Sequence, residues 1–80
     1  MSVTGSRDFV VKSSYGLFLR QVSDLTHRWV ESPGDATAWP SFVHAFTGAE
    51  KLGVDVEYSV HERRWRWLSN GQVGAYELWP

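Results

Sequence analysis

The amino-acid sequence predicts a small α+β domain in which one helix packs on one face of an antiparallel sheet of about five strands. Three observations predict this class. Short strand-like runs flank turn-forming residues near both ends of the chain, an apolar stripe with helical spacing lies in the middle, and residues 54–61 alternate strictly between apolar and polar side chains. A chain of 80 residues forms one such domain, which we assign to residues 8–80, with residues 1–7 as a flexible arm.

The first part of the chain contains three predicted strands. Residues 9–12 and 17–20 are apolar runs separated by the turn-forming segment 13–16, so we expect a β-hairpin over residues 8–22. Apolar side chains occur on both faces of these strands, which is typical of strands covered on both sides. A third short strand is expected over residues 26–31, before a Ser-Pro-Gly-Asp turn.

One helix is predicted, from about Pro40 to Leu52. Proline suits the first helical turn, where its missing N–H costs nothing, and Gly53 supplies a left-handed C-cap. Gly48 within this helix costs about 1 kcal/mol relative to alanine. The apolar residues recur at helical spacing and form one stripe. This stripe consists of Phe42, Ala45, Phe46, Ala49 and Leu52.

The alternation of apolar and polar residues over 54–61 predicts a half-buried strand with one solvent-exposed face. Its apolar residues are expected to receive the helix stripe. They are Val54, Val56, Tyr58 and Val60. These positions are even-numbered, whereas Trp65 and Trp67 are odd-numbered, and two interpretations follow. A bulge or bend at His61–Arg63 would return both tryptophans to the core, which the usual burial of tryptophan favours. Alternatively, the ribbon projects and both indoles are exposed.

Residues 63–68 and 73–79 form a second predicted hairpin around Asn70-Gly71, because Asn-Gly between strand-like runs is the strongest short-range hairpin signal. A two-residue loop determines the pairing of the two strands. Aromatic and oppositely charged pairs across the strands would stabilise it. The expected pairs are Leu68–Val73, Trp67–Gly74, Arg66–Ala75, Trp65–Tyr76 and Arg64–Glu77.

Composition excludes several classes of function. Eight basic and nine acidic side chains give a net charge of −1, which is neither the basic field of a general duplex binder nor the acidic coat of a DNA mimic. The absence of cysteine excludes thiolate chemistry and the usual structural zinc sites, and it favours a reducing compartment. We find no apolar leader and no apolar run long enough to cross a membrane, so we expect a cytoplasmic protein without membrane contact.

The sequence predicts no enzyme, no cofactor and no metal site. His27, His44 and His61 show no spacing that is typical of metal ligands. Asp55 and Glu57 share the polar face of the predicted strand, which suits paired-carboxylate chemistry. Exposed carboxylates on a strand usually serve only solvation, so we assign them no role.

The aromatic residues indicate a binding surface instead. Five tryptophans are present among 80 residues, and two of them alternate with arginine near the C-terminus. Tryptophan and arginine dominate the energetics of protein interfaces, so we predict a contact surface for a partner protein on this strand. Its residues are Arg63, Arg64, Trp65, Arg66 and Trp67. The alternative is a single-stranded RNA- or DNA-binding module in which the same strand stacks bases and holds phosphates.

Residues 8–61 resemble a pattern common among small proteins of phages and mobile elements. The parts that carry the resemblance are the opening hairpin, the isolated tryptophan in Arg28-Trp29-Val30, the connector Ala36-Thr37-Ala38-Trp39, and a short helix closing in Ala49-Glu50-Lys51-Leu52-Gly53 before a strand. Compact α+β chains of this kind include anti-CRISPR proteins and other inhibitors of host machinery.

This resemblance implies a phage-encoded stoichiometric inhibitor. Such a protein acts by occupying a surface on a host protein or nucleoprotein complex in the cytoplasm of a bacterial host. Nucleic acid is the second class of partner that we consider. A homodimer through an exposed sheet edge at residues 73–79 is a further alternative.

Overall fold

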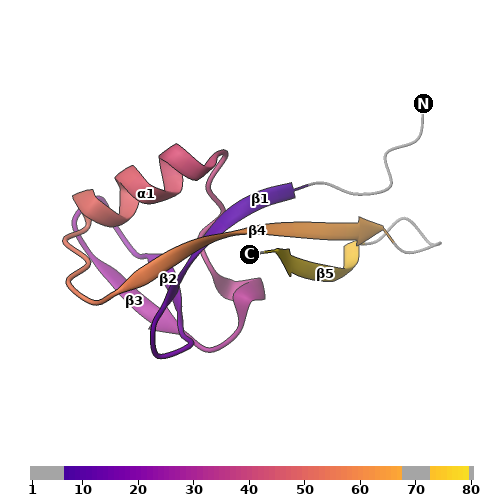
Figure 1. Cartoon of the computed structure of the whole chain (residues 1–80), viewed down its shortest axis with the longest axis horizontal. Coiled ribbons are helices and arrows are strands. Elements are labelled where there is room, and N and C mark those ends of the chain that lie inside the picture. The colour runs from indigo at the N-terminus through magenta and orange to yellow at the C-terminus, as the bar shows by residue number, and fades with distance from the viewer. Residues whose placement is uncertain (1–6, 68–72, 80) are drawn as a thin grey trace.

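The structure, a computed structural model, describes residues 7–67 and 73–79, with the side chains of residues 7–64 and of Leu78. The strands form one antiparallel sheet in the order β3-β2-β1-β4-β5, and α1 lies across one face of it (Figure 1). The predicted class, α+β with one helix on an antiparallel sheet, is confirmed for this part of the chain. The elements are β1 (Arg7–Ser13), β2 (Phe18–Gln21), β3 (His27–Val30), the 3-10 helix η1 (Pro33–Asp35), α1 (Phe42–Lys51), β4 (Tyr58–Trp67) and β5 (Val73–Trp79).

The first predicted hairpin is confirmed, and it opens soon after its turn. Lys12 pairs with Phe18, the Ser13 N–H donates to the Leu17 carbonyl at 2.7 Å, and Gly16 takes the positive φ of +85° that the turn requires. Farther along, β1 and β2 separate and the connector reaches both of them. Phe9 and Trp39 exchange two backbone hydrogen bonds of 2.9 Å, so the chain before α1 is tied to β1.

Strand β4, with ten residues, is the longest strand described, and it differs from our expectations in its start and in its pairing. It begins at Tyr58 rather than Val54, because the chain leaving α1 first closes the helix end, where the Val54 N–H donates to the Ala49 carbonyl at 3.1 Å. Its pairing with β1 runs without a shift from Ser13–Tyr58 to Arg7–Arg64, so no bulge interrupts His61–Arg63. The same pairing places Arg7, the last residue of the predicted arm, in β1; residues 1–6 lie outside the described residues.

The hairpin of β4 and β5 follows the expected register over most of its length. The pairs Arg66–Ala75, Trp65–Tyr76 and Arg64–Glu77 are confirmed. A register shift between Arg66 and Trp67 places Trp67 opposite Val73, so the predicted Trp67–Gly74 pair is wrong. The Leu68–Val73 pair involves a residue outside the described ones. Both strands reach well beyond the part of the sheet that α1 covers (Figure 1).

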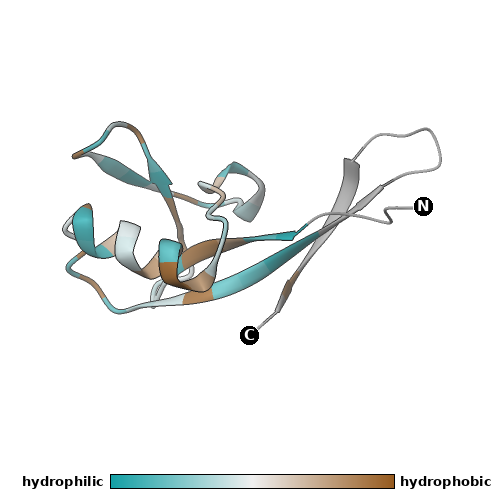
Figure 2. Ribbon diagram, turned by 90° about the horizontal axis from the view of Figure 1, so that it is seen from above, coloured by the Kyte–Doolittle hydropathy of each residue, from teal (hydrophilic) through white to brown (hydrophobic). Residues whose placement is uncertain are grey.

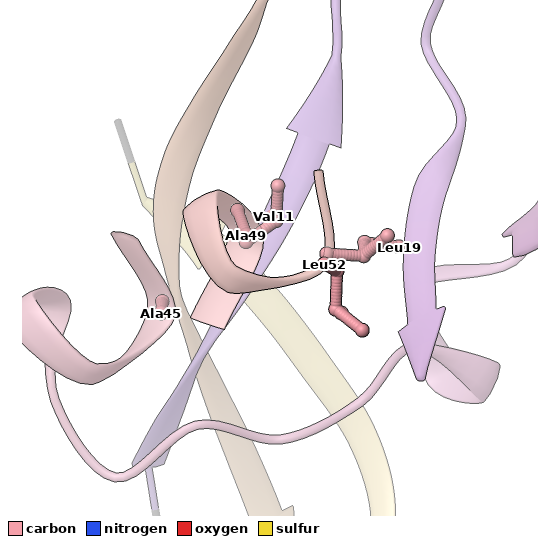
Figure 3. Packing of buried hydrophobic residues seen from close by; sticks show 5 residues of the cluster. All are labelled: Val11, Leu19, Ala45, Ala49 and Leu52. Carbon is pink, nitrogen blue, oxygen red and sulfur yellow. The ribbon is translucent and has the colours of Figure 1, made fainter. Parts of the chain in front are cut away.

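The core is divided between the two faces of the sheet. Beneath α1, side chains of β1 and β2 meet the helix in a cluster of Val11, Leu19, Ala45, Ala49 and Leu52 (Figure 3). On the opposite face, the chain around η1 covers a smaller cluster of Val10, Phe18 and Ala36. The prediction that β1 and β2 are covered on both sides is therefore confirmed.

The helix presents small residues to the sheet, which overturns our prediction that Phe42 and Phe46 belong to the buried stripe. These two side chains are 55% and 49% exposed, whereas Ala45 and Ala49 are fully buried. The Trp39 ring explains the difference, because it lies against Gly48 so closely that a Cβ at that position would be 2.3 Å from its Cη2. The aromatic volume between helix and sheet thus comes from Trp39, and the phenylalanines lie to one side.

The helix ends agree with the signals in the sequence, with a small displacement at the start. Ser41 is the N-cap, since its Oγ accepts from the His44 N–H at 3.1 Å, and Pro40 precedes it. Gly53 has φ of +72° and closes the C-terminus as predicted.

Candidate binding surface

Arg63, the first residue of the predicted contact strand, lies in the interior and not on the surface where we expected it. It is 3% exposed. Its Nε and Nη2 donate to the two carboxylate oxygens of Asp8 at 2.7 and 3.0 Å, and its Nη1 donates to the Pro33 carbonyl. Bidentate geometry and burial make this a strong contact that ties β4 to β1 and to η1. Arg63 therefore has a structural role in linking β4 to β1 and η1, and we leave it out of the contact surface.

Arg64 lies on the surface, where it shares a carboxylate with Arg7. The two arginines are paired across β4 and β1. Glu62 accepts from Arg64 Nε at 2.9 Å and from Arg7 Nη1 at 3.1 Å. One carboxylate thus lies between two guanidinium groups.

Trp65, Arg66 and Trp67 continue β4 and pair with β5, the strand at the edge of the sheet. Their side chains are outside the described ones, so the predicted contact role of these three residues stays a prediction. Polar residues occupy β4 where it leaves the region below α1 (Figure 2).

The structure also shows an apolar surface that we did not predict from the sequence. It consists of Phe42, Val43 and Phe46, and we call it the α1 flank. These side chains are 55%, 69% and 49% exposed. In Figure 2 the start of α1 is coloured brown, for apolar residues, with a hydrophilic band beside it. Large apolar side chains grouped on one helix in this way are typical of contact sites.

Tyr58, at the start of β4, borders the α1 flank on the side of Phe46 and Glu50. Its ring is 5.8 Å from that of Phe46, and its hydroxyl donates to Glu50 Oε2 at 2.6 Å. Burial of the phenol, together with the hydrogen bond to Glu50 and the charge of that carboxylate, raises the pKa of Tyr58 to about 12. The hydroxyl therefore stays protonated at physiological pH, and it holds the Glu50 carboxylate beside the apolar side chains.

A shallow hollow of about 210 Å³ lies on the other side of Tyr58. It is lined by Ser14, Glu57, Tyr58 and Ser59. The Ser14 N–H donates to the Glu57 carbonyl at 2.8 Å, which fixes the backbone of this wall. Its lining therefore contains one acidic residue, Glu57, together with two serines and Tyr58.

One signal in the sequence could have indicated the α1 flank. At about 100° per residue, the apolar positions from Leu52 through Phe46 to Val43 cover about 180° of the helix circumference. A helix on a sheet buries a stripe of about 100° or somewhat more. We placed Phe42 and Phe46 in the buried stripe and gave Val43 no role, although the width of the apolar arc exceeds what one face can bury.

The residues considered for catalysis do not form a site in the described part of the chain. Asp55 and Glu57 lie in the segment before β4 and not on a common strand face. Within the described ranges, no group of three or more histidine, aspartate or glutamate side chains could hold a metal ion. His44 and His61 bond to neighbouring serines, at 2.6 and 2.7 Å respectively.

Comparison with protein-family models, with curated proteins and with solved structures finds no match to this chain. Among the described residues, no helix has the length and apolar character needed to cross a membrane.

Proposed function

We propose that this chain is a non-enzymatic binding protein that occupies a surface of a partner protein, with the α1 flank as its main contact. One observation carries the proposal: three large apolar side chains on one side of α1 are about half exposed or more. Together they present on the order of 300 Å² of apolar surface, the size at which a patch on a small monomer is often functional. Leaving this surface in water has a cost that contact with a partner removes.

The more specific form of the proposal is a phage-type inhibitor of a host protein or nucleoprotein complex. It is supported by the resemblance of residues 8–61 to small inhibitors of host machinery. An inhibitor that acts by occlusion needs a rigid contact surface and no chemistry. The α1 flank has such a support, because Ala45 and Ala49 anchor the helix to the sheet.

The alternative is single-stranded nucleic-acid binding along β4. The observation that favours it is the pairing of Arg7 with Arg64 on adjacent strands, next to the segment that contains Trp65 and Trp67. Glu62 accepts from both arginines, which weakens the field that a phosphate backbone would meet. We therefore place protein binding first.

A pull-down from bacterial lysate, with and without nuclease, tests the proposal with a matched pair of variants. The flank variant Phe42→Ser/Val43→Ser removes two exposed side chains of α1. The control variant Val22→Ser/Leu25→Ser removes two side chains that are 63% and 82% exposed in the turn between β2 and β3. Both variants change only exposed positions, so we expect each to retain the circular dichroism spectrum of the wild type.

The proposal predicts one stoichiometric protein that survives nuclease, is retained by the control variant and is lost with the flank variant. If the flank variant retains the protein, the α1 flank is not the contact. If nuclease removes the recovered material and Arg64→Ala weakens its binding, the nucleic-acid alternative is correct.

A further inference from the structure

We propose that the partner presents an amphipathic segment in which apolar side chains cover the α1 flank and a lysine or arginine enters the hollow beside Glu57. This inference rests on the proposed function, since it specifies the chemistry of the partner at the same site. Its basis is the combination of apolar area, carboxylate placement and the hollow around Tyr58.

The apolar area of the α1 flank is too small to form an interface alone. A stable complex buries about 800 Å² on each partner, and the flank supplies roughly 300 Å². The remainder of the contact must come from the polar rim. Interfaces of this kind have an apolar centre surrounded by polar contacts, so the charge of the rim determines which partner fits.

The rim next to Tyr58 is acidic. The Glu50 carboxylate is held 2.6 Å from the Tyr58 hydroxyl on the α1 side of the sheet. Glu57 lines the hollow together with Ser59, which pairs with Lys12 and faces away from α1. From Val43 to Tyr58 the chain contains three carboxylates, one lysine, Lys51, and one histidine, His44. At about 100° per residue, Lys51 lies about 140° around α1 from Phe46 and about 80° from Val43, and it belongs to the last turn of the helix.

The hollow has the chemistry that a cationic side chain needs. A lysine or arginine there would lie beside the exposed Glu57 and Ser14, whereas the Ser59 hydroxyl already bonds His61 Nε2 at 2.7 Å. A volume of about 210 Å³ accommodates the end of one such side chain but not a large ligand.

The same charges argue against a second copy of this chain as the occupant. A two-fold contact places the same surface of both copies face to face. Glu50 and Glu57 of one copy would then approach the carboxylates of the other without a basic residue on the flank to separate them. A basic amphipathic partner has no such repulsion.

Selection from a phage-displayed library of random peptides tests this inference. Selected peptides are synthesised, and their affinities are measured by fluorescence anisotropy for the wild type, Glu57→Gln and Asp24→Asn. Asp24 is the matched control because it is an exposed carboxylate in the turn between β2 and β3, at the opposite end of β2 from Ser14. The flank variant Phe42→Ser/Val43→Ser is measured in parallel.

We expect peptides that combine apolar residues with lysine or arginine. Glu57→Gln should weaken their binding about threefold to fivefold, the upper range for an exposed ion pair, and Asp24→Asn should leave it unchanged. Replacing the basic residue of the peptide by glutamine should have the same effect, and the two changes should not add, because each removes the same contact.

Each other outcome contradicts the inference in a different way. Peptides whose affinity falls for the flank variant but is unchanged for Glu57→Gln would overturn the inference and remain consistent with the proposed function. Peptides that bind the flank variant as tightly as the wild type would contradict both the inference and the proposed function. A selection that enriches no peptide would do the same. Sedimentation of the protein alone gives a further check, since a dimer dissociated by the flank variant would assign the α1 flank to a second copy.

Discussion

The contact between Trp39 and Gly48 predicts that Gly48→Ala destabilises the protein, although the same change stabilises an ordinary helix. A Cβ at position 48 would lie 2.3, 2.4 and 2.9 Å from Cη2, Cζ3 and Cζ2 of the indole. Carbon atoms at optimal contact are about 3.5–4.0 Å apart, so the ring must move by more than about 1 Å. The ring cannot retreat easily, because both backbone hydrogen bonds of Trp39 go to Phe9.

The magnitude follows from two opposing effects. Replacing glycine by alanine within a helix contributes about 1 kcal/mol of stability. Forcing a methyl group into a filled core costs about 1–3 kcal/mol. We expect the second effect to prevail at Gly48, with a net loss of up to about 2 kcal/mol in the free energy of unfolding.

Urea denaturation followed by far-ultraviolet circular dichroism measures this loss. Thr47→Ala at the exposed neighbouring position is the control for helix propensity, and it should leave stability unchanged or slightly higher. Introduced together with Trp39→Leu, Gly48→Ala should become stabilising by up to about 1 kcal/mol, because the indole no longer opposes it. An increase in stability from Gly48→Ala in the wild-type background would refute the packing argument.

Two further predictions concern groups whose charge depends on the fold. In urea denaturation, Asp8→Asn should lower the free energy of unfolding by about 3 kcal/mol and Arg63→Met by about 2 kcal/mol. Asp8→Asn leaves the Arg63 cation without its carboxylate at a side chain that is only 4% exposed. Arg63→Met leaves the Asp8 carboxylate, which is 20% exposed and can be hydrated. The reverse order would show that the carboxylate, and not the guanidinium, depends on the pair. Tyr58 binds its proton more tightly in the folded state, with a pKa of about 12 against 10.0, so its contribution is complete below pH 10 and is lost as the pH rises towards 12. Unfolding free energies across that interval should fall more for the wild type than for Tyr58→Phe, and equal slopes would contradict the assignment.

The sequence by itself determined the elements that depend on a few neighbouring residues. The turn at residues 13–16 and the Asn70-Gly71 dipeptide predicted two hairpins, and the described pairs Trp65–Tyr76 and Arg64–Glu77 follow the register that we expected. Gly53 ends the helix as a left-handed C-cap. Such signals are local because a turn or a cap is decided by backbone conformation and short hydrogen bonds within one or two turns of chain.

The tertiary structure alone decided which side chains became buried. Arg63 looked like part of a contact surface, and Asp8, 55 positions away, turned it into an interior ion pair. Phe42 and Phe46 looked like core residues, and Trp39 occupied the space between helix and sheet in their place. The physical reason is that distant side chains compete for the limited area of one small sheet, and periodicity along the chain does not show which of them is closer to it.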